Sequence, residues 1–295
     1  MRNAFIDELV LAARLNERIV LIVGDLGYGV VEPFAREFPQ RFINSGVAEQ
    51  SMMSVAAGLA SEGYHPFVYS IANFPTFRCA EQIRNDVAYH NLPVTVVAVG
   101  GGLSYGSLGY SHHAVQDYAL IRSMPGMLIA SPGDPFEVRA CMRYLIRNPQ
   151  PSYLRLGKAG EPILHETVPE VKPGEWVSVR KGTSNRRAYL TTGGVLDWVV
   201  NEAPVKDSVY SMPLWGMAFK ESQVNLVTEH ESVITVEDHL RDGGMGSWML
   251  EALSGRPELI TRIRIEALSP AVCGMVGRQS TLNAEGGLTR RRLCE

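Results

Sequence analysis

The sequence has 295 residues, of which 45% are hydrophobic, so the chain can bury substantial cores and form two domains. Its 28 basic and 31 acidic residues nearly balance, giving a formal net charge of -3, which provides no strong positive field to hold a nucleic acid. Asp7 and Glu8 interrupt the apolar stretch that a signal peptide needs, and no apolar run approaches the ~20 residues of a membrane span. We expect a soluble cytoplasmic protein that binds neither nucleic acid nor a membrane.

Helical and strand patterns alternate along the first half of the chain. In chain order, the apolar periodicity predicts a helix at 4–15, strands at 19–23 and 42–44, a helix at 50–61, a strand at 66–69, a helix at 80–90, a strand at 94–99, a helix at 115–123, a strand at 127–130 and a helix at 135–147. Strands that are apolar on both faces and separated by helices imply a parallel sheet covered on both sides. We therefore predict a doubly wound α/β domain over 1–160.

The chain becomes proline-rich between 157 and 174, which is typical of a surface linker. Strands at 188–191, 207–211 and 233–236 and a helix at 247–253 then predict a second, smaller α/β domain over 174–295. The four cysteines lie far apart, without a CxxC pair or a histidine at metal-ligand spacing, so we interpret them as buried or incidental thiols and expect no metal ligands on this chain.

Glu49 lies where the strand at 42–44 gives way to the helix at 50–61, at the carboxyl edge of the predicted sheet, where open α/β sheets bind ligands. Taken alone, this position has an ordinary explanation, because the helix dipole stabilises an acidic side chain in the first turn. Nearby motifs change that interpretation. GVAEQ at 46–50 is followed by a helix rich in alanine and glycine, and DLG at 25–27, EQIRNDVAYHNLPV at 81–94 and GYSHHAVQDYALIRSMPGM at 109–127 share the same stretch of chain.

In this order, the motifs resemble the pyrimidine-binding domain of transketolases, and GVAEQ is also similar to the activating segment of 1-deoxyxylulose-5-phosphate synthases and of 2-oxo acid dehydrogenase β subunits. The resemblance covers 4–158 and implies thiamine diphosphate as cofactor. In the family a carboxylic acid shares a proton with the aminopyrimidine ring, which leads to the carbanion at the thiazolium carbon. Glu49 is thereby predicted to be catalytic and to contact the cofactor, in apolar surroundings expected from Val47, Met52 and Met53.

The resemblance assigns three more side chains to the cofactor. Phe74 and Phe77 stand where the family places aromatic rings against the aminopyrimidine, which an aromatic face holds by dispersion. Asp25 resembles the acid near the thiazolium ring. From the residues alone, core packing stays open for Phe77 and turn capping for Asp25.

Four side chains receive catalytic or substrate-binding roles from the resemblance. His112 corresponds to the histidine that faces the reacting carbonyl group, where an imidazole donates to a developing oxyanion or moves a proton. His113 is predicted to do similar work or to hold the loop. Lys158 stands near the position of a phosphate-binding arginine, and Arg155 lies close by, so both are predicted to bind an anionic substrate group.

The sequence also departs from the transketolase pattern. Leu108 replaces the aspartate that recognises a sugar hydroxyl group, and Gly100 replaces a histidine that binds the acceptor's phosphate, so ordinary pentose phosphates are not expected as substrates. The segment at 233–253 resembles the family's C-terminal domain, in which Glu237, Asp238 and His239 are expected to be structural.

A complete enzyme of this kind needs a second domain, marked by GDG and a following asparagine, that binds Mg²⁺ and the diphosphate. The segments at 24–26 and 133–135 do not satisfy that pattern, so a separate subunit is expected to supply this half. Two copies of each subunit would form a closed α2β2 assembly, with self-association through this chain. We predict the C-terminal subunit of a two-component transketolase-like transferase (EC 2.2.1 type) that moves a two-carbon ketol or acyl unit to an aldehyde or ketone, such as a sugar.

Two alternatives stay open. A 2-oxo acid such as pyruvate could be the donor, as in deoxyxylulose-phosphate synthases and dehydrogenase β subunits, and Leu108 is compatible with that reaction. The chain could also be a non-catalytic scaffold subunit, although a dead site has no physical need for Glu49, Phe74 and His112 together.

Overall fold

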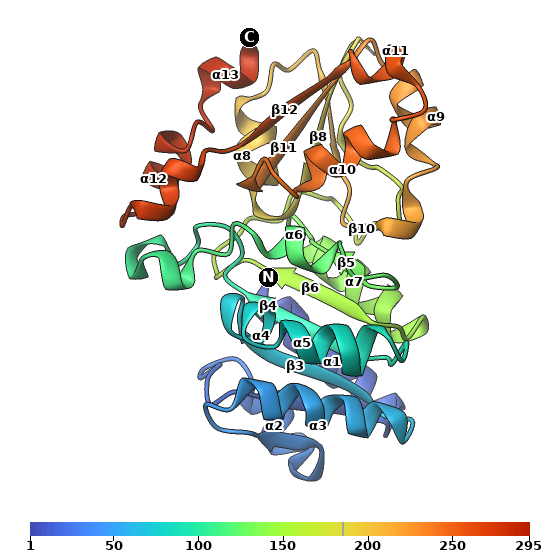
Figure 1. Ribbon diagram of the computed structural model, residues 1–295, viewed down its shortest axis with the longest axis vertical. Coiled ribbons are helices and arrows are strands. Elements are labelled where there is room, and N and C mark those ends of the chain that lie inside the picture. The colour runs from blue at the N-terminus through green and yellow to red at the C-terminus, as the bar shows by residue number, and fades with distance from the viewer. Residues whose placement is uncertain (185) are drawn as a thin grey trace.

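Most of the first half of the chain folds around a seven-stranded sheet with the order β10-β5-β6-β4-β3-β1-β2 (Figure 1). The computed structural model describes residues 1–184 and 186–295. Neighbouring strands run parallel, except that β10 is antiparallel to β5. The strands are β1 (Ile19–Val23), β2 (Phe42–Asn44), β3 (His65–Ile71), β4 (Thr95–Val99), β5 (Leu128–Ala130), β6 (Ser152–Leu156) and β10 (Leu214–Gly216).

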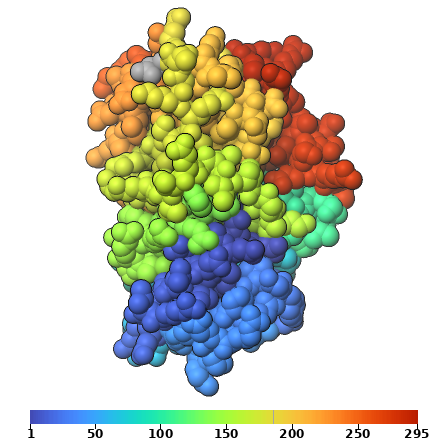
Figure 2. Space-filling model, turned by 180° about the vertical axis from the view of Figure 1, so that it is seen from behind, coloured from blue at the N-terminus to red at the C-terminus, as the bar shows by residue number. Residues whose placement is uncertain are grey.

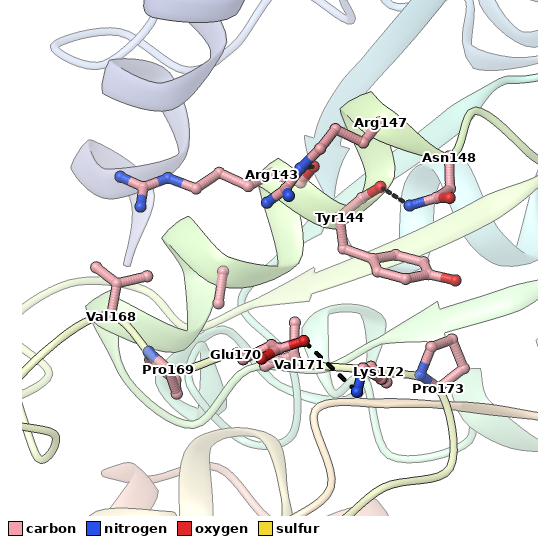
Figure 3. A pocket seen from close by; sticks show the side chains of 11 residues that line it. Arg143, Tyr144, Arg147, Asn148, Val168, Pro169, Glu170, Val171, Lys172 and Pro173 are labelled. Atoms are coloured by element: carbon pink, nitrogen blue, oxygen red, sulfur yellow. Dashed lines mark hydrogen bonds and ion pairs between the residues drawn. The ribbon is translucent and has the colours of Figure 1, made fainter.

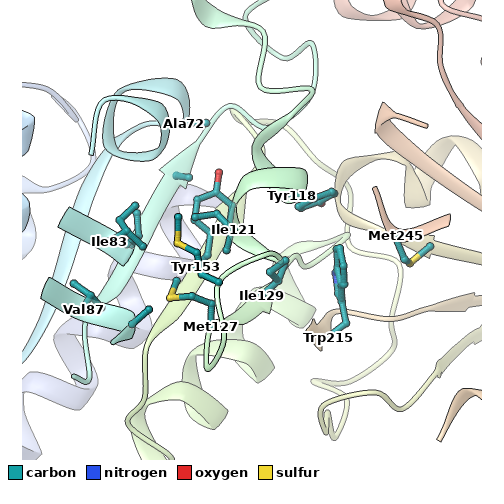
Figure 4. Close-up of a cluster of buried hydrophobic side chains, with 14 of the residues drawn as sticks. Ala72, Ile83, Val87, Tyr118, Ile121, Met127, Ile129, Tyr153, Trp215 and Met245 are labelled. Atoms are coloured by element: carbon teal, nitrogen blue, oxygen red, sulfur yellow. The ribbon is translucent and has the colours of Figure 1, made fainter. Parts of the chain in front are cut away.

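Helices cover both faces of this sheet, because successive strand residues point to opposite sides and both sides are apolar. In β1, Leu21 belongs to the core beneath α1 and α7, whereas Ile22 belongs to the core beneath α3. The second of these cores continues past Tyr118 to Trp215 and Met245 of the other half of the chain (Figure 4). The helices of this half are α1 (Arg2–Leu15), α2 (Glu32–Glu37), α3 (Glu49–Ser61), α4 (Asn73–Phe77), α5 (Ala80–Gln82), α6 (Asp117–Ile121) and α7 (Pro135–Arg147), with short helical turns η1 (Pro39–Arg41), η2 (Ile83–Ala88), η3 (Gly106–Leu108) and η4 (Tyr110–His112).

The second half of the chain folds around a five-stranded sheet with the order β12-β11-β8-β9-β7, in which only the β7–β9 pair is antiparallel within the described residues. Its strands are β7 (Val177–Arg180), β8 (Arg187–Thr192), β9 (Ser208–Ser211), β11 (Ser232–Leu240) and β12 (Ile263–Leu268). Its helices are α8 (Leu196–Glu202), α9 (Gln223–Thr228), α10 (Met245–Ala252), α11 (Pro257–Ile260), α12 (Gln279–Glu285) and α13 (Arg290–Cys294), with turns η5 (Gly193–Val195), η6 (Met217–Phe219) and η7 (Pro270–Gly274). Across the described ranges, the helices lack the combination of length and apolar character that a bilayer crossing requires.

The predicted α/β class, with a parallel sheet wound on both faces and a smaller second sheet, is confirmed. The strands at 19–23 and 42–44 and the helix at 135–147 match to the residue, and the other predicted strands shift by one to four residues at an end. The helix predicted at 80–90 is instead one α-helical turn, α5, followed by the π-helical η2.

The segment between β6 and β7, residues 157–176, contains no helix or strand and leads from the first sheet to the second. On the face shown in Figure 2, yellow-green atoms of this part of the chain lie between the blue N-terminal region and the orange part of the second half. Part of the segment runs along α7 and leaves a groove of about 530 Å³, in which Lys172 pairs with Glu170 (Figure 3). This groove is lined by residues other than those predicted for function. The division into 1–160 and 174–295 stays a prediction, and β10, from the second half, is an edge strand of the first sheet.

Candidate active site at the carboxyl edge of the first sheet

The site residues predicted in the first half follow the carboxyl ends of parallel strands, apart from Arg155, which lies within β6. Because parallel strands end at the same edge of a sheet, this edge is where an open α/β fold collects side chains from distant parts of the sequence. Asp25 follows β1, Glu49 follows β2, Phe74 and Phe77 lie in α4 after β3, His112 and His113 lie in the loop after β4, and Lys158 follows β6.

Glu49 is the first residue of α3 and is 3% exposed. Met52 and Met53 are fully buried below it, as expected, but Val47 is 76% exposed and does not enclose the carboxylate. The buried Oε2 of Glu49 has no hydrogen-bond partner among the residues that the structure describes, and Arg78 Nη1 lies 3.7 Å away. The carboxylate therefore keeps an acceptor site that the described residues leave unused.

A cleft of about 930 Å³ lies next to Arg78, the residue that approaches this carboxylate, although Glu49 itself does not line it. Phe74, Phe77, Tyr110 and His113 line the cleft as well, whereas His112 is not among its lining residues. Arg78 thus lines the cleft and also approaches Glu49. Phe74 is half-buried and Phe77 is 42% exposed, so neither has the full burial expected of a core phenylalanine.

Cys79 lies close to two predicted cofactor residues, Phe74 and Glu49. Its Sγ is 3.7 Å from the Phe74 carbonyl oxygen. Burial, followed by the nearby charge of Glu49, raises the pKa of the Cys79 thiol to about 12. This thiol therefore stays protonated at neutral pH. Its two neighbours belong to α4 and to the start of α3, which lie next to each other.

The two adjacent histidines point in different directions. The ring of His112 meets that of Phe74 edge to face at 5.4 Å, and its Nδ1 lies 3.0 Å from Ser111 Oγ. His113 is 1% exposed, with Nε2 3.4 Å from the carbonyl oxygen of Gly106. His112 is thus partly exposed, and the contacts of the buried His113 resemble those of a residue that holds the loop.

The histidine loop rests on both halves of the chain. Asn73 Nδ2 donates to the carbonyl oxygens of Ser111 and His113, at 3.0 and 3.1 Å. The carbonyl oxygen of Gly106 also accepts from the Gly277 amide at 3.2 Å, and a side chain on Gly106 would overlap Leu282 of α12. Figure 1 shows α12 alongside this loop. The C-terminal half thus fixes the loop that carries the histidines.

Asp25 is exposed and has a positive φ of 54°. Its Oδ1 accepts from Asn44 Nδ2 at 3.0 Å and from the Tyr28 hydroxyl at 3.1 Å. The hydrogen bond from Asn44, and next that from Tyr28, lowers the pKa of Asp25. These bonds fit the turn-capping alternative. The exposed carboxylate still lies at the carboxyl edge of the sheet, next to β2, the strand that precedes Glu49.

The predicted pair of substrate cations divides into a buried and an exposed residue. Arg155 is 2% exposed, and each of its five N–H donors has an acceptor inside the protein. Two of these acceptors are carboxylates, with Nε 2.8 Å from Asp117 and Nη1 2.6 Å from Asp238. Arg155 therefore joins the two halves of the chain rather than facing a substrate, which corrects the prediction. Lys158 is exposed, with Nζ 5.2 Å from the centre of the Tyr105 ring.

Glu237, Asp238 and His239 lie near the end of β11 and are fully enclosed. Glu237 accepts from the backbone amides of Met245 and Gly246 at the start of α10, at 2.6 and 2.9 Å. Burial raises the pKa of Glu237 to about 8, and burial lowers the pKa of His239, which stacks on Tyr118 at 5.0 Å. These contacts agree with the structural roles expected for the three residues.

Three residues of this region were not predicted from the sequence: Asn73, Arg78 and Tyr105. Asn73 and Arg78 flank the predicted Phe74 and Phe77 in the sequence, so their proximity in the chain was a usable signal. Tyr105 is recognised only through its contacts. In the described ranges, no group of three or more histidine, cysteine, aspartate or glutamate residues is arranged to hold a metal ion.

Comparison with known proteins gives a match to the family model "Transketolase, pyrimidine binding domain" over residues 1–160. The chain belongs to the transketolase family. This result confirms the resemblance drawn from the motifs around Glu49.

The relatives of the transketolase family include single subunits and larger enzymes. An apulose-4-phosphate transketolase subunit of Phocaeicola vulgatus is 32% identical over 302 residues, covering 100% of this chain and 95% of the relative. A 1-deoxy-D-xylulose-5-phosphate synthase of Thermus thermophilus is 30% identical over 96% of this chain, but only 46% of that enzyme is covered. A solved structure described as "Split gene transketolase, inactive beta4 tetramer" superposes with a TM-score of 0.85 at 29% identity, covering 99% of this chain and 94% of the other.

Proposed function

We propose that the chain is the cofactor-activating subunit of a two-component, thiamine diphosphate-dependent transketolase-like transferase. The relatives support this proposal, because an apulose-4-phosphate transketolase subunit and a split-gene transketolase match this chain along nearly their whole length. The reaction would transfer a two-carbon ketol or acyl unit to an aldehyde or ketone acceptor. The name of the Phocaeicola vulgatus relative favours a phosphorylated sugar as a reactant.

The observation that carries the proposal is the unused acceptor of Glu49. A buried carboxylate oxygen normally has a hydrogen-bond partner, and an exception 3.7 Å from Arg78, a residue that lines a cleft, supports a group supplied from outside the chain. The residues present fit an aminopyrimidine ring, since Glu49 offers an acceptor above the buried Met52 and Met53, and Phe74, in the adjacent α4, offers a half-buried aromatic ring.

Thiamine diphosphate, when bound, supplies the carbon nucleophile that attacks the donor's carbonyl group. Glu49 would share a proton with the aminopyrimidine ring, and Phe74 and Phe77 would pack against that ring. His112 would donate to the carbonyl oxygen of the substrate as negative charge develops there. His113 would hold the loop, Lys158 would bind an anionic substrate group, and Asp25 would contribute a negative charge near the cofactor.

A separate polypeptide would supply the other half of the site. It would carry the GDG motif and the asparagine that hold Mg²⁺ and the diphosphate, which this sequence lacks. Two copies of each subunit would assemble as α2β2, with this chain contacting a second copy of itself. Activity would then depend on both polypeptides.

A second candidate is the decarboxylation of a 2-oxo acid such as pyruvate, favoured by the likeness to 1-deoxy-D-xylulose-5-phosphate synthase and by the apolar Leu108. The test is to produce the chain together with its GDG-bearing partner and to assay two reactions with thiamine diphosphate and Mg²⁺. We expect ketol transfer from a phosphorylated ketose without release of carbon dioxide. Release of carbon dioxide from pyruvate would favour the second candidate, and failure of the pair to bind the cofactor would favour a scaffold role.

A further inference from the structure

Tyr105 occupies a special place at the carboxyl edge, directly against the backbone of Gly100. Gly100 has a positive φ of 85°, and a Cβ atom there would overlap the Tyr105 ring. Only glycine leaves room for this contact and adopts this backbone conformation without strain. The backbone of Gly100, directly after β4, therefore packs against the Tyr105 ring and fixes its position.

The next two glycines, Gly101 and Gly102, pack closely against other residues and so also fix this loop. A Cβ on Gly101 would overlap the Arg155 guanidinium, and one on Gly102 would overlap the Asp238 carboxylate. Arg155 and Asp238 are themselves joined by an ion pair of 2.6 Å. The loop that bears Tyr105 is thus held by a rigid, buried charge cluster, which limits how far the ring can move.

The Tyr105 ring lies close to two side chains that have roles in the proposed function. Its ring centre is 6.3 Å from that of His112, with an angle of 70° between the rings. The Lys158 ammonium lies 5.2 Å from the same ring centre, within the range of a cation–π interaction. Tyr105 therefore links the two residues that the proposed function assigns to the carbonyl group and to the anionic group of a substrate.

We propose that Tyr105 is a specificity-determining residue that selects substrates by the distance between their carbonyl carbon and an anionic group. Its ring contacts both side chains and holds the Lys158 ammonium at a set distance from His112. The ligand class is a short hydroxyaldehyde or hydroxyketone that carries a phosphate group at the far end. The inference rests on the proposed function, because it uses the roles given there to His112 and Lys158.

The test compares two probes that differ only in the phosphate group, glyceraldehyde 3-phosphate and glyceraldehyde, as acceptors for the assembled pair. For Tyr105→Leu we expect the preference for the phosphorylated acceptor, measured as the ratio of kcat/KM values, to fall about fivefold through its KM. Tyr105→Phe keeps the ring, so its ratio should stay within about twofold of the wild-type value. Lys158→Met should lower the ratio at least as far as Tyr105→Leu.

The double variant Tyr105→Leu/Lys158→Met tests whether Tyr105 acts by positioning Lys158 or independently of Lys158. If Tyr105 acts through the ammonium, the double variant should match Lys158→Met alone, because the two changes remove one interaction. Tyr64→Leu is a matched control, since the Arg18 guanidinium lies 5.1 Å from the centre of that ring and both residues precede parallel strands, at the opposite edge of the sheet. It should leave the ratio unchanged.

An unchanged ratio in Tyr105→Leu, with an active wild-type pair, would overturn the inference and leave the proposed function intact. An equal loss of kcat with both acceptors, together with a lower Tm, would overturn it as well, because Tyr105 would then be structural. Isothermal titration of the assembled pair with the same two probes gives a readout without turnover, and there too Tyr105→Leu should reduce the affinity difference about fivefold. A wild-type pair that binds the probes but transfers no ketol unit would instead refute the proposed function.

Discussion

Glu49 and Glu237 are both buried glutamates beside the first turn of a helix, yet their oxygen atoms have opposite surroundings. Both oxygens of Glu237 accept backbone hydrogen bonds from the start of α10. Oε2 of Glu49 is left without a hydrogen bond by every residue that the structure describes, and its neighbour Arg78 lines a cleft. A carboxyl group whose two oxygens both accept hydrogen bonds stabilises the fold. A carboxyl group with an oxygen that accepts none, next to a residue that lines a cleft, is available for a ligand.

The two arginines near these glutamates differ in the same way. Arg155 is buried and uses all of its donors to join the two halves of the chain. The side chain of Arg78 is 59% exposed, and its contact with Glu49 is long, at 3.7 Å. Substitutions in the enclosed region should therefore change stability, and substitutions at the edge of the cleft should change activity.

The largest effect is expected for Glu49→Ala. Turnover of the assembled pair should fall by about 10²- to 10⁴-fold, because a proton-sharing group is removed. The free energy of unfolding should change by less than ~1 kcal/mol, since Oε2 makes no hydrogen bond that the described residues would lose. Steady-state kinetics and urea denaturation check the two halves of this expectation. A loss of stability that accounts for the loss of activity would make Glu49 structural.

Arg155→Met should lower the free energy of unfolding by about 3–5 kcal/mol, because Asp117 and Asp238 would stay buried without a counter-charge. Thermal and urea denaturation of the single chain measure this loss. Arg139→Met is the control: it removes ion pairs with Asp7 and Glu8, but Arg143 still pairs with Glu8, so it should cost less than Arg155→Met. Equal effects of the two changes would refute the distinction between enclosed and exposed clusters.

Glu237 should make stability depend on pH. Its pKa is raised from 4.5 to about 8 in the folded chain, so between these values the folded state keeps a proton that the unfolded state has lost. The contribution of this group therefore favours folding at low pH and weakens as pH rises from about 4.5 to 8, by at most ~1.4 kcal/mol per pH unit. Urea denaturation at pH 5 to 8 should show a steeper decline for the wild type than for Glu237→Gln. An equal loss of stability with pH in the wild type and in Glu237→Gln would contradict a raised pKa of Glu237.

The smallest effect is expected for Arg78→Met. An exposed ion pair contributes little to stability, so the free energy of unfolding should change by less than ~1 kcal/mol. Turnover should fall less than tenfold, because the cation lies beside Glu49 without a hydrogen bond to it. A loss as large as that of Glu49→Ala, measured by the same kinetics, would transfer the central role to Arg78.

The sequence predicted the long elements well, because β1 is apolar on both faces and α7 is amphipathic over 13 residues. It missed α4 and β10, since a five-residue helix and a three-residue strand are too short to show a period. The structure brings the predicted Glu49, Phe74 and His112 to one sheet edge, while their roles stay a proposal.

Contacts between distant residues could not be predicted in the same way. Arg155 looked available because its partners, Asp117 and Asp238, lie 38 and 83 residues away in the sequence. Tyr105 gave no signal in its own neighbourhood, because its ring contacts Lys158 and Gly100 through the tertiary fold. Val47 is apolar, yet it lies in the turn before α3 and faces outward.

The most direct measurement is the exchange of the thiazolium C2 proton of thiamine diphosphate with deuterated water, followed by NMR after rapid quenching of the assembled pair. The wild-type pair should exchange this proton far faster than the free cofactor does, and Glu49→Gln should bring the rate back close to that of the free cofactor, with the cofactor still bound. Exchange at the wild-type rate in Glu49→Gln would contradict a role for the Glu49 carboxyl group in sharing a proton with the cofactor.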